Sequence, residues 1–396
     1  MELNSIINEF IKLYGGSKDD LRVFQSPGRV NMIGEHTDYN GGFVFPAALT
    51  MCTTIVVRKR NDNIIRLKAT DLDIMVEADI DKLDSYRDLK WGNYQLGVAY
   101  VLQEAGYDIV GCDMLYDDTV PHGSGLSSSA AIEVATALCF ATFSNEKNGI
   151  IKDVDMIEMA KLGQKAENQY CGVNCGIMDQ FASAMGKKDH AIFLKCDDLS
   201  FDYAPILLNG MKIVLSNTKK KHSLGASKYN ERRAECEQGY KILSAALPGK
   251  KCLGEISVEE FEANKHLIED DVILKRIKHV IYEDDRVLKS VEALKNGDVK
   301  AFGSYMNASG DSLRYDYEVT GDELDVMVEE ARKIDGVIGS RMTGGGFGGC
   351  TVSIVKEDSV DRFIEQVGKN YTARTGIVPE FYVSDIGDGG KEIIDF

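Results

Sequence analysis

Residues 120–140 (VPHGSGLSSSAAIEVATALCF) join a glycine- and serine-rich loop directly to an apolar helical pattern. Ile132, Val134, Ala135 and Leu138 recur at helical spacing and supply the buried face of the expected helix. A helix that starts from such a loop presents unpaired backbone N–H groups and the positive end of its dipole at one point. The loop and helix together are typical of a phosphate-binding site.

A second glycine-rich loop, RMTGGGFGGCTVSIV (341–355), lies near the other end of the chain and is followed by a strand pattern. Its glycines permit positive φ angles and close approach of the backbone to a ligand. Neither loop has the G-x-x-x-x-G-K-[ST] pattern of a Walker-type site. The first loop also lacks the strand, turn and later ribose-binding acid of a dinucleotide fingerprint. The sequence therefore predicts a phosphate site of another kind.

Residues 26–46 (SPGRVNMIGEHTDYNGGFVFP) place several ionisable side chains on a short glycine-bounded stretch between apolar runs. Small polyols require such a set, because each buried hydroxyl needs a donor or acceptor held in place. Glu35 and Asp38 can accept from hydroxyls, and His36 can accept or donate. Arg29 offers a fixed cationic fork. A polar turn that leads into a strand is the structural alternative, and these residues alone leave both open.

Three motifs in this order resemble those of a known superfamily. PxGxGLSSSAA and GGGFGG resemble the second and third motifs of the GHMP small-molecule kinases, and GRVNMIGEHTDYNGG resembles the galactokinase version of the first. The resemblance runs from residue 26 to about residue 355, and Met32 stands where leucine is more usual. It implies an α/β fold of the α+β type, with the active site in the cleft between an N-terminal lobe (1–200) and a C-terminal lobe (201–396).

The galactokinase resemblance implies galactose and ATP as substrates and galactose 1-phosphate as product, the first committed step of galactose catabolism. The sugar-binding residues that it implies are Glu35, His36, Thr37, Asp38, Gly176, Asp179 and Tyr229. The residues that it implies for the phosphates of ATP are Gly123, Ser124, Gly125, Leu126, Ser127, Ser128 and Ser129, with Trp91 against the adenine ring. Without the resemblance, Trp91 would be read as a core aromatic residue.

Asp179 is an ionisable residue inside an apolar stretch, GIMDQFASAM. Buried carboxylates are rare unless they are paired or functional, and a helix-capping aspartate is the structural alternative. The resemblance implies that Asp179 accepts the proton of the anomeric hydroxyl, while Arg29 pairs with it and offsets charge on the transferred group. It also implies Glu167 and Ser129 as Mg²⁺ ligands, although Glu167 alone would be read as a helix-surface glutamate.

The composition indicates a globular enzyme rather than a nucleic-acid-binding or membrane protein. The formal net charge of −17 opposes nucleic-acid binding, and no apolar run reaches eighteen residues. The acidic N-terminus has no basic n-region, and nine scattered cysteines fit a reducing compartment, so we expect a cytoplasmic protein. Cys171 and Cys175 lack the partners of a zinc site. No exposed apolar stripe demands a partner, which favours a monomer.

The chain pattern predicts alternating strands and helices without internal repeats. Strands are expected at 53–60, 64–71, 112–120, 211–217, 351–355 and 380–387, and helices at 91–107, 154–171 and 323–334, with long charged helical stretches over 229–295. A lobe boundary is expected near 197–210. The basic run 219–233 is either a solvated loop and helix face or, through Tyr229, part of the sugar site.

Two other functions fit parts of the sequence. One is a GHMP kinase for another acceptor, such as N-acetylgalactosamine, galacturonate, arabinose or mevalonate. Glu35 and Asp38 favour a neutral hexose over an acidic sugar, and the first motif favours galactose. The other is a sensor that binds galactose and ATP without catalysis. Such sensors can lack residues of the serine loop, which is intact here together with Arg29 and Asp179.

Overall fold

The computed structural model describes residues 1–206, 208, 210–220 and 225–396, and these residues form three β-sheets flanked by helices. The largest sheet has the strand order β13-β1-β3-β6-β4-β5 and is antiparallel except where β4 pairs with β6. Its strands are β1 (Arg22–Asn31), β3 (Pro46–Lys59), β4 (Ile64–Ala69), β5 (Val76–Asp79), β6 (Cys112–Asp118) and β13 (Lys391–Ile393).

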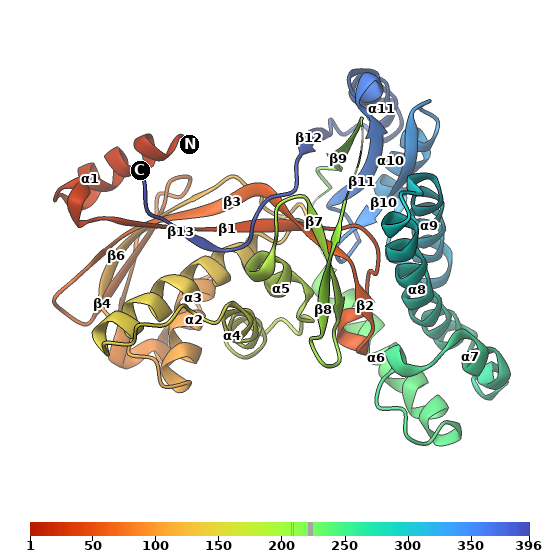
Figure 1. Cartoon of the computed structure of the whole chain (residues 1–396), viewed down its shortest axis with the longest axis horizontal. Coiled ribbons are helices and arrows are strands. Elements are labelled where there is room, and N and C mark those ends of the chain that lie inside the picture. The colour runs from red at the N-terminus through yellow and green to blue at the C-terminus, as the bar shows by residue number, and fades with distance from the viewer. Residues whose placement is uncertain (207, 209, 221–224) are drawn as a thin grey trace.

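Helices cover both faces of this sheet because successive residues of its strands point to opposite sides. Phe24 and Ile55 cluster with residues of the helices α2 (Gly92–Glu104), α3 (Ser128–Lys147) and α4 (Met156–Gln169), and α5 (Met178–Met185) also packs against β1 and β3. Val23 and Val56 face α1 (Leu3–Tyr14) instead. Figure 1 shows α1 on one side of the sheet and the other four helices on the opposite side. Helix α3 packs between the sheet and α2, α4 and α5, so it is buried on most of its surface.

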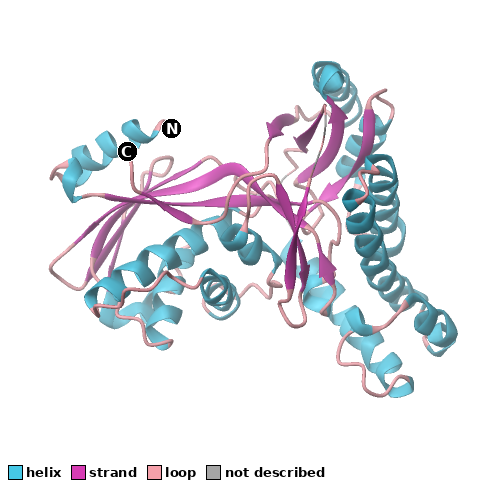
Figure 2. Cartoon of the chain, in the orientation of Figure 1, coloured by secondary structure: helices cyan, strands magenta, loops and turns pink. Residues whose placement is uncertain are grey.

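The second half of the chain forms an antiparallel four-stranded sheet with helices against it (Figure 2). Its strand order is β10 (Val337–Thr343), β11 (Cys350–Lys356), β9 (Met211–Asn217) and β12 (Glu380–Ser384). The helices of this half are α6 (Gly225–Ala246), α7 (Val258–Asn264), α8 (Asp271–Lys295), α9 (Val299–Ser312), α10 (Asp322–Arg332) and α11 (Val360–Thr375). A small sheet of β2 (Phe43–Val44), β7 (His190–Lys195) and β8 (Phe201–Pro205) lies where the two halves meet.

The mixed α/β class and most expected elements are confirmed. The strand expected at 53–60 is longer, because Pro46–Lys59 forms one continuous strand against β1. The long charged helical stretches expected over 229–295 are confirmed as the helices α6, α7 and α8. Among the described residues, no helix has the length and apolar character needed to cross a membrane.

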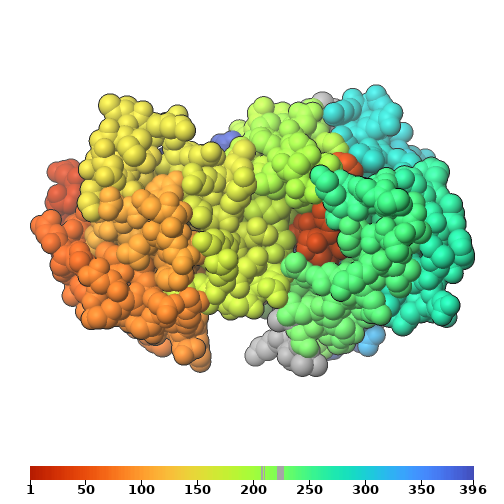
Figure 3. All heavy atoms as spheres, turned by 90° about the horizontal axis from the view of Figure 1, so that it is seen from below, coloured from red at the N-terminus to blue at the C-terminus, as the bar shows by residue number. Residues whose placement is uncertain are grey.

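The predicted division at residue 200 stays a prediction, but one element crosses it. Strand β13, at the end of the chain, pairs with β1 in the first sheet rather than with the second half. One hydrophobic core also joins the halves, since Val30 and Leu126 cluster with Leu215 and Val352. Figure 3 shows a hollow between the two halves on the face seen from below. Residues 207 and 209 of the expected boundary, and residues 221–224 of the basic run, lie outside the described residues.

Candidate active site

Asp179 meets Arg29 and Ser127 where three distant segments converge. Oδ1 of Asp179 accepts from Nε of Arg29 at 2.9 Å, and Oδ2 accepts from the hydroxyl of Ser127 at 2.5 Å. Nη1 of Arg29 donates to the carbonyl of Gly125 at 2.7 Å. The Arg29 side chain is only 4% exposed, whereas that of Asp179 is 30% exposed. Asp179 is therefore the anion of a buried ion pair whose carboxylate reaches a cavity.

The local sequence explains how β1 delivers Arg29 to this point. The pairing of β1 with β3 shifts register between Pro27 and Arg29, which marks a β-bulge at Gly28. A Cβ on Gly28 would lie 2.6 Å from the carbonyl oxygen of Leu126, so only glycine lets the strand approach the serine loop. The amide of Arg29 then donates to that same carbonyl at 3.0 Å.

The serine loop presents free backbone amides at the start of α3. Gly123, Gly125 and Ser127 all have positive φ angles, and Ser127 precedes the first residue of the helix. Within the described part of the chain, the amides from Gly125 to Ala130 donate to no protein acceptor. The side chain of Ser127 cannot cap the helix, since it donates to Asp179. These donors and the helix dipole suit the phosphates of a nucleotide, as the sequence predicted.

The backbone of the late glycine loop packs against that of the serine loop. Gly344, Gly346 and Gly349 have positive φ angles, as expected from the sequence. A Cβ on Gly344 would lie 2.9 Å from the carbonyl oxygen of Gly125, and a Cβ on Gly349 would lie 2.9 Å from that of Ser124. The two glycine loops, more than two hundred residues apart, therefore touch through their backbones.

A small enclosed cavity of about 60 Å³ adjoins Asp179 and gathers most of the residues predicted for the sugar. Its lining comprises Arg29, Glu35, His36, Asp38, Cys175, Gly176, Met178, Asp179, Tyr229, Gly344 and Gly345. A larger cavity of about 410 Å³ shares Cys175, Asp179, Tyr229 and Gly345 and extends along both glycine loops past Glu167. We call the smaller one the sugar pocket and the larger one the phosphate cavity. Asp179 lies on the wall of both.

Asp38 and Gly176 fit each other closely at the sugar pocket. A Cβ on Gly176 would lie 1.9 Å from Oδ2 of Asp38, so any larger residue would displace this carboxylate. Burial raises the pKa of Asp38 to about 6, and the nearby charge of Asp179 adds to the rise. Two carboxylates therefore face one small polar pocket, which suits a ligand rich in hydroxyl donors.

Glu35 is almost completely buried and held by three partners. Oε1 accepts from the amide of Gly344 at 2.6 Å, and Oε2 accepts from the side-chain amide of Asn31. Nη2 of Arg341, which is itself fully buried, lies 3.3 Å from Oε2. Burial raises the pKa of Glu35, although Arg341 and Arg29 oppose the rise. The carboxylate is thus fixed in orientation before any ligand binds.

Thr37 is the one predicted sugar residue that the structure keeps out of the pocket. Its side chain is fully buried, and its hydroxyl lies 2.9 Å from the carbonyl oxygen of Gly34 and 2.7 Å from that of Phe43. The hydroxyl therefore closes the turn that carries Glu35, His36 and Asp38. The galactokinase resemblance placed Thr37 with the sugar; its hydroxyl has local partners in the structure, and its role toward a sugar stays a prediction.

Tyr229, on the first turns of α6, reaches the sugar pocket from the second half of the chain. Its ring is half-buried and lies 5.5 Å from the His36 ring and 5.3 Å from the Tyr39 ring, between centroids. An aromatic ring and its hydroxyl can pack against a sugar and hydrogen-bond to it. The structure thus brings the part of the basic run around Tyr229 to the wall of this pocket.

Glu167 and Ser129 lie close enough to form one hydrogen-bonded group near the phosphate cavity. Burial raises the pKa of Glu167 to about 7, with a further contribution from Asp179, and a hydrogen bond with Ser129 opposes the rise. Nε2 of Gln180 donates to Glu167 at 2.7 Å and to Glu133 at 2.8 Å. A buried carboxylate beside a hydroxyl and a phosphate loop provides the hard oxygen donors that Mg²⁺ prefers.

Trp91 lies in a third cavity, of about 230 Å³, that opens beside the start of α3. Tyr94, Tyr116 and Ile132 line it together with Ser128 and Ser129. The Trp91 indole N–H is buried without a partner. The cavity is largely apolar and adjoins the serine loop. Trp91 also packs on the hydrophobic core, and its place against an adenine ring stays a prediction.

Comparison with known proteins agrees with this geometry over nearly the whole chain. The galactokinase galactose-binding signature matches residues 8–59, and the N-terminal and C-terminal GHMP kinase domains match residues 93–187 and 290–373. Galactokinase from Fusobacterium nucleatum is 48% identical over 394 residues, which cover 99% of this chain and 100% of that protein. Galactokinase from Clostridium acetobutylicum is 50% identical over 375 residues, 94% of each chain.

The chain belongs to the galactokinase family.

Solved structures agree with this family and its fold. The crystal structure of Lactococcus lactis galactokinase complexed with galactose matches with a TM-score of 0.93 and 40% identity, over 99% of this chain and 100% of that chain. Methanococcus jannaschii mevalonate kinase, at 18% identity, matches with a TM-score of 0.67 over 94% of this chain and 100% of that chain, which shows the GHMP kinase fold alone. Membership of the galactokinase family makes this chain a sugar kinase.

Several residues of this galactokinase-family site were missed by sequence reasoning. Arg341 was read only as the start of a glycine loop, and its contact with Glu35 depends on the fold. Glu133 is fully buried, and burial raises its pKa well above the usual range. A signal for Glu133 did exist, because it interrupts the apolar face of the helix predicted after the serine loop. Gln180 had no such signal.

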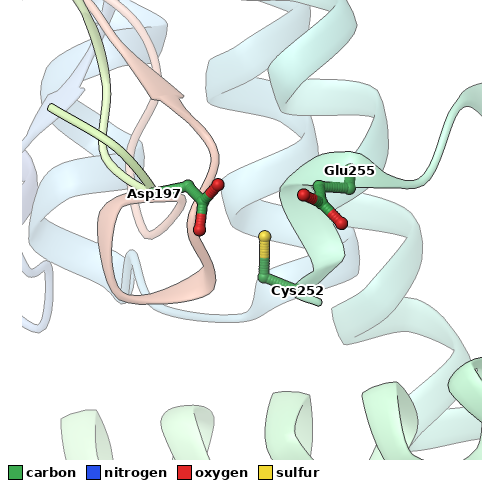
Figure 4. Close-up of side chains that lie close together, drawn as sticks. All are labelled: Asp197, Cys252 and Glu255. Atoms are coloured by element: carbon green, nitrogen blue, oxygen red, sulfur yellow. The ribbon is translucent and has the colours of Figure 1, made fainter. Parts of the chain in front are cut away.

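One further cluster of potential metal ligands lies away from the galactokinase-family site. Oxygen and sulfur atoms of Asp197, Cys252 and Glu255 come within 4.8 Å of one another (Figure 4). Asp197 pairs with Lys195, and Oε2 of Glu255 accepts from the amide of Lys251 at 2.6 Å. These contacts account for both carboxylates without a metal.

Proposed function

We propose that this chain is a galactokinase that transfers the γ-phosphoryl group of ATP to the anomeric hydroxyl of galactose, giving galactose 1-phosphate and ADP. The observation that supports this most strongly is the position of Asp179, which lines both the sugar pocket and the phosphate cavity and is held by Arg29 and Ser127. A group on the wall of both cavities can touch an acceptor hydroxyl and lie near the phosphorus that it attacks.

In the proposed reaction, galactose occupies the sugar pocket, with its hydroxyls against Glu35, His36, Asp38 and Tyr229, beside the backbone of Gly176. The anomeric oxygen attacks the γ-phosphorus, a new O–P bond forms, and the bond to the β-phosphate oxygen breaks to release ADP. Asp179 accepts the proton of the anomeric hydroxyl. Since the transition state of phosphoryl transfer is loose, positioning and electrostatics provide most of the catalysis.

Arg29 has two roles in this scheme. Its Nε donates to the Asp179 carboxylate and orients it, and its Nη1 donates to the carbonyl of Gly125 and fixes the serine loop. Its positive charge also offsets the charge of the transferred group. Because an overall charge of −17 repels a triphosphate, this local cation and the free amides of the serine loop are needed to bind it.

ATP is proposed to lie with its phosphates along Gly123–Ser129 and its adenine beside Trp91. Mg²⁺ would be held by Ser129 and Glu167, where the donor set fits it, and when bound it neutralises phosphate charge. The side-chain amide of Gln180 donates to the Glu167 carboxylate and orients it. We further propose that the enzyme works as a cytoplasmic monomer, without nucleic-acid or membrane partners.

The test is ADP release by purified protein with Mg²⁺ and ATP across a panel of sugars, with the phosphorylated position located by NMR. Turnover with galactose that yields the 1-phosphate supports the proposal. Turnover confined to N-acetylgalactosamine or to an acidic sugar would overturn the substrate but keep the phosphate site. Saturable galactose binding without turnover would favour a sensor.

A further inference from the structure

His36 has an unusual backbone and an incompletely paired ring. It adopts the left-handed region with φ 64°, a conformation that side chains other than glycine rarely adopt and that costs energy. Its ring is buried and lines the sugar pocket, and Nδ1 lies 2.8 Å from the Tyr39 hydroxyl. Among the residues that the structure describes, Nε2 has no hydrogen-bond partner. An unpaired buried nitrogen beside a pocket needs a ligand group to satisfy it.

A line of hydrogen-bonding side chains leads from His36 into the second half of the chain. The Tyr39 hydroxyl lies 2.8 Å from that of Tyr317, at the end of the short helix η6 (Leu313–Tyr317). The Tyr317 hydroxyl in turn lies 3.2 Å from Sγ of Cys236 on α6. Tyr317 and Cys236 are completely buried, so no bulk water competes for these bonds. We call these four residues the His36 relay.

Each hydroxyl and thiol of the His36 relay carries one proton, so the hydrogen bonds can run in only two directions. A phenol is the more acidic donor and a neutral imidazole nitrogen the more basic acceptor, which favours donation from Tyr39 to Nδ1. Tyr39 then needs a donor for its oxygen, which Tyr317 supplies, and Cys236 supplies one to Tyr317. This direction leaves the imidazole proton on Nε2.

Two further observations agree with this direction. Burial lowers the pKa of His36 to about 3, so the ring is neutral and carries a single proton. Nδ1 already faces the Tyr39 hydroxyl, which leaves Nε2, unpaired among the described residues, as the ring position open to the pocket. The proton is therefore favoured on Nε2, next to the loop that lines the sugar pocket.

We propose that Cys236, Tyr317 and Tyr39 are positioning residues that fix His36 as the Nε2–H tautomer and thereby give the sugar pocket a neutral hydrogen-bond donor. The inference rests on the sugar-binding role proposed above for His36. Glu35, Asp38 and Asp179 offer only acceptors when ionised, whereas each sugar hydroxyl both donates and accepts. A hydroxyl that donates to one of these carboxylates can accept from Nε2 of His36.

The test is ¹⁵N NMR of the histidine side chains in the unliganded protein at neutral pH, with the His36 signals assigned by their loss in His36→Gln. We expect a protonated Nε2 and an unprotonated Nδ1 in the wild type. Tyr39→Phe removes the donor to Nδ1, so the proton should distribute over both nitrogens. Tyr371→Phe is the matched control, because it deletes one buried hydroxyl that donates to the Thr218 carbonyl at 2.8 Å, outside the His36 relay.

A wild-type ring protonated on Nδ1, or a Tyr39→Phe ring with the wild-type distribution, would overturn the proposal. A second variant pair tests the far end of the relay. Cys236→Ser keeps a donor and should retain the tautomer, whereas Cys236→Ala should loosen it. Galactose KM should rise about tenfold in Tyr39→Phe while kcat changes less than about threefold. Because the NMR experiment uses no substrate, a wild type that fails to bind galactose would refute the proposed function separately.

Discussion

The sugar pocket and the phosphate cavity are neighbours built in opposite ways. The sugar pocket encloses about 60 Å³ and is walled by charged and aromatic side chains that other side chains hold in place. The phosphate cavity has about 410 Å³, and its lining includes Gly125 of the serine loop and Gly345, Gly346 and Gly348 of the late glycine loop. Asp179 stands on the boundary between them.

This difference follows from the two substrates proposed. A neutral sugar is not repelled by several carboxylates. The fixed positions of these carboxylates distinguish it from other sugars. A triphosphate needs hydrogen-bond donors and positive charge instead, which the free amides of the serine loop, the helix dipole and Arg29 supply. The account therefore expects side-chain substitutions to affect the sugar side selectively, whereas Asp179 and Arg29 should affect the reaction itself.

The largest effect is expected at the boundary. Asp179→Asn should lower kcat by about 10³-fold, roughly 4 kcal/mol of barrier, because the acceptor of the anomeric proton is lost. Galactose affinity should change little, since the amide keeps the size and one acceptor of the carboxylate. Single-turnover kinetics and calorimetric galactose binding measure the two quantities. Asp153→Asn, at an exposed residue, is the control, and activity within about tenfold of wild type would remove Asp179 from its role.

Arg29→Ala should follow, with kcat lowered about 10²-fold and galactose KM raised much less. The guanidinium orients Asp179 and also holds the serine loop through Gly125. Steady-state kinetics with each substrate varied in turn check this. An effect limited to KM would make Arg29 a residue that binds the ground state and the transition state equally.

Gly176→Ala tests whether the two cavities are independent, because it should disturb the sugar pocket alone. The new Cβ would overlap Oδ2 of Asp38, so galactose KM should rise at least about tenfold while ATP KM stays within about twofold. Gly368→Ala in α11 is the control, since its Cβ would meet only the Phe381 ring, at 3.2 Å. Equal losses for both substrates would show that the two cavities are not independent.

Trp91→Ala gives the opposite selectivity. Removing an aromatic wall from the cavity beside Ser128 and Ser129 should raise ATP KM several-fold, about 1 kcal/mol, with galactose KM unchanged. Trp91→Phe should retain most of the affinity. If the alanine variant bound ATP normally but melted at a lower temperature, Trp91 would be a core residue only.

The last expected effect acts on stability and its pH dependence rather than on kinetics. Because the pKa of Asp38 is raised to about 6, the folded state holds this proton more tightly than the unfolded state. That contribution to stability is present below the usual aspartate pKa and is lost as pH rises through 6. Asp38→Asn should therefore be more stable than wild type at pH 8, by up to about 3 kcal/mol, and much closer to wild type near pH 4. Urea unfolding at both pH values tests the sign, and a variant less stable at pH 8 would contradict it.

Sequence reasoning was most successful where local pattern decides structure. The helix after the serine loop and the strand at 211–217 follow from periodicity, and the α/β class follows from their alternation. The sugar motif was found because its side chains are close in sequence. Arg341 and Gln180 were missed because their partners, Glu35 and Glu167, lie in other segments, and only the fold brings them together.

Two features that sequence reasoning did not foresee have specific physical causes. Thr37 lies among pocket residues in sequence, yet a tight turn directs its hydroxyl to the carbonyls of Gly34 and Phe43. Strand β13 joins the first sheet because the edge of β1 offers it unpaired backbone groups. Hydrophobic periodicity does not indicate where one side chain of a turn points. It also does not indicate which strand the C-terminal segment pairs with.

A crystal structure with galactose, Mg²⁺ and a non-hydrolysable ATP analogue tests the central claim most directly. The account predicts the anomeric hydroxyl within hydrogen-bonding distance of Asp179 and in line with the γ-phosphorus. It also predicts other sugar hydroxyls at Glu35 and Asp38, and the metal between Ser129 and Glu167. An anomeric hydroxyl turned away from Asp179, or a nucleotide bound away from the serine loop, would contradict the account.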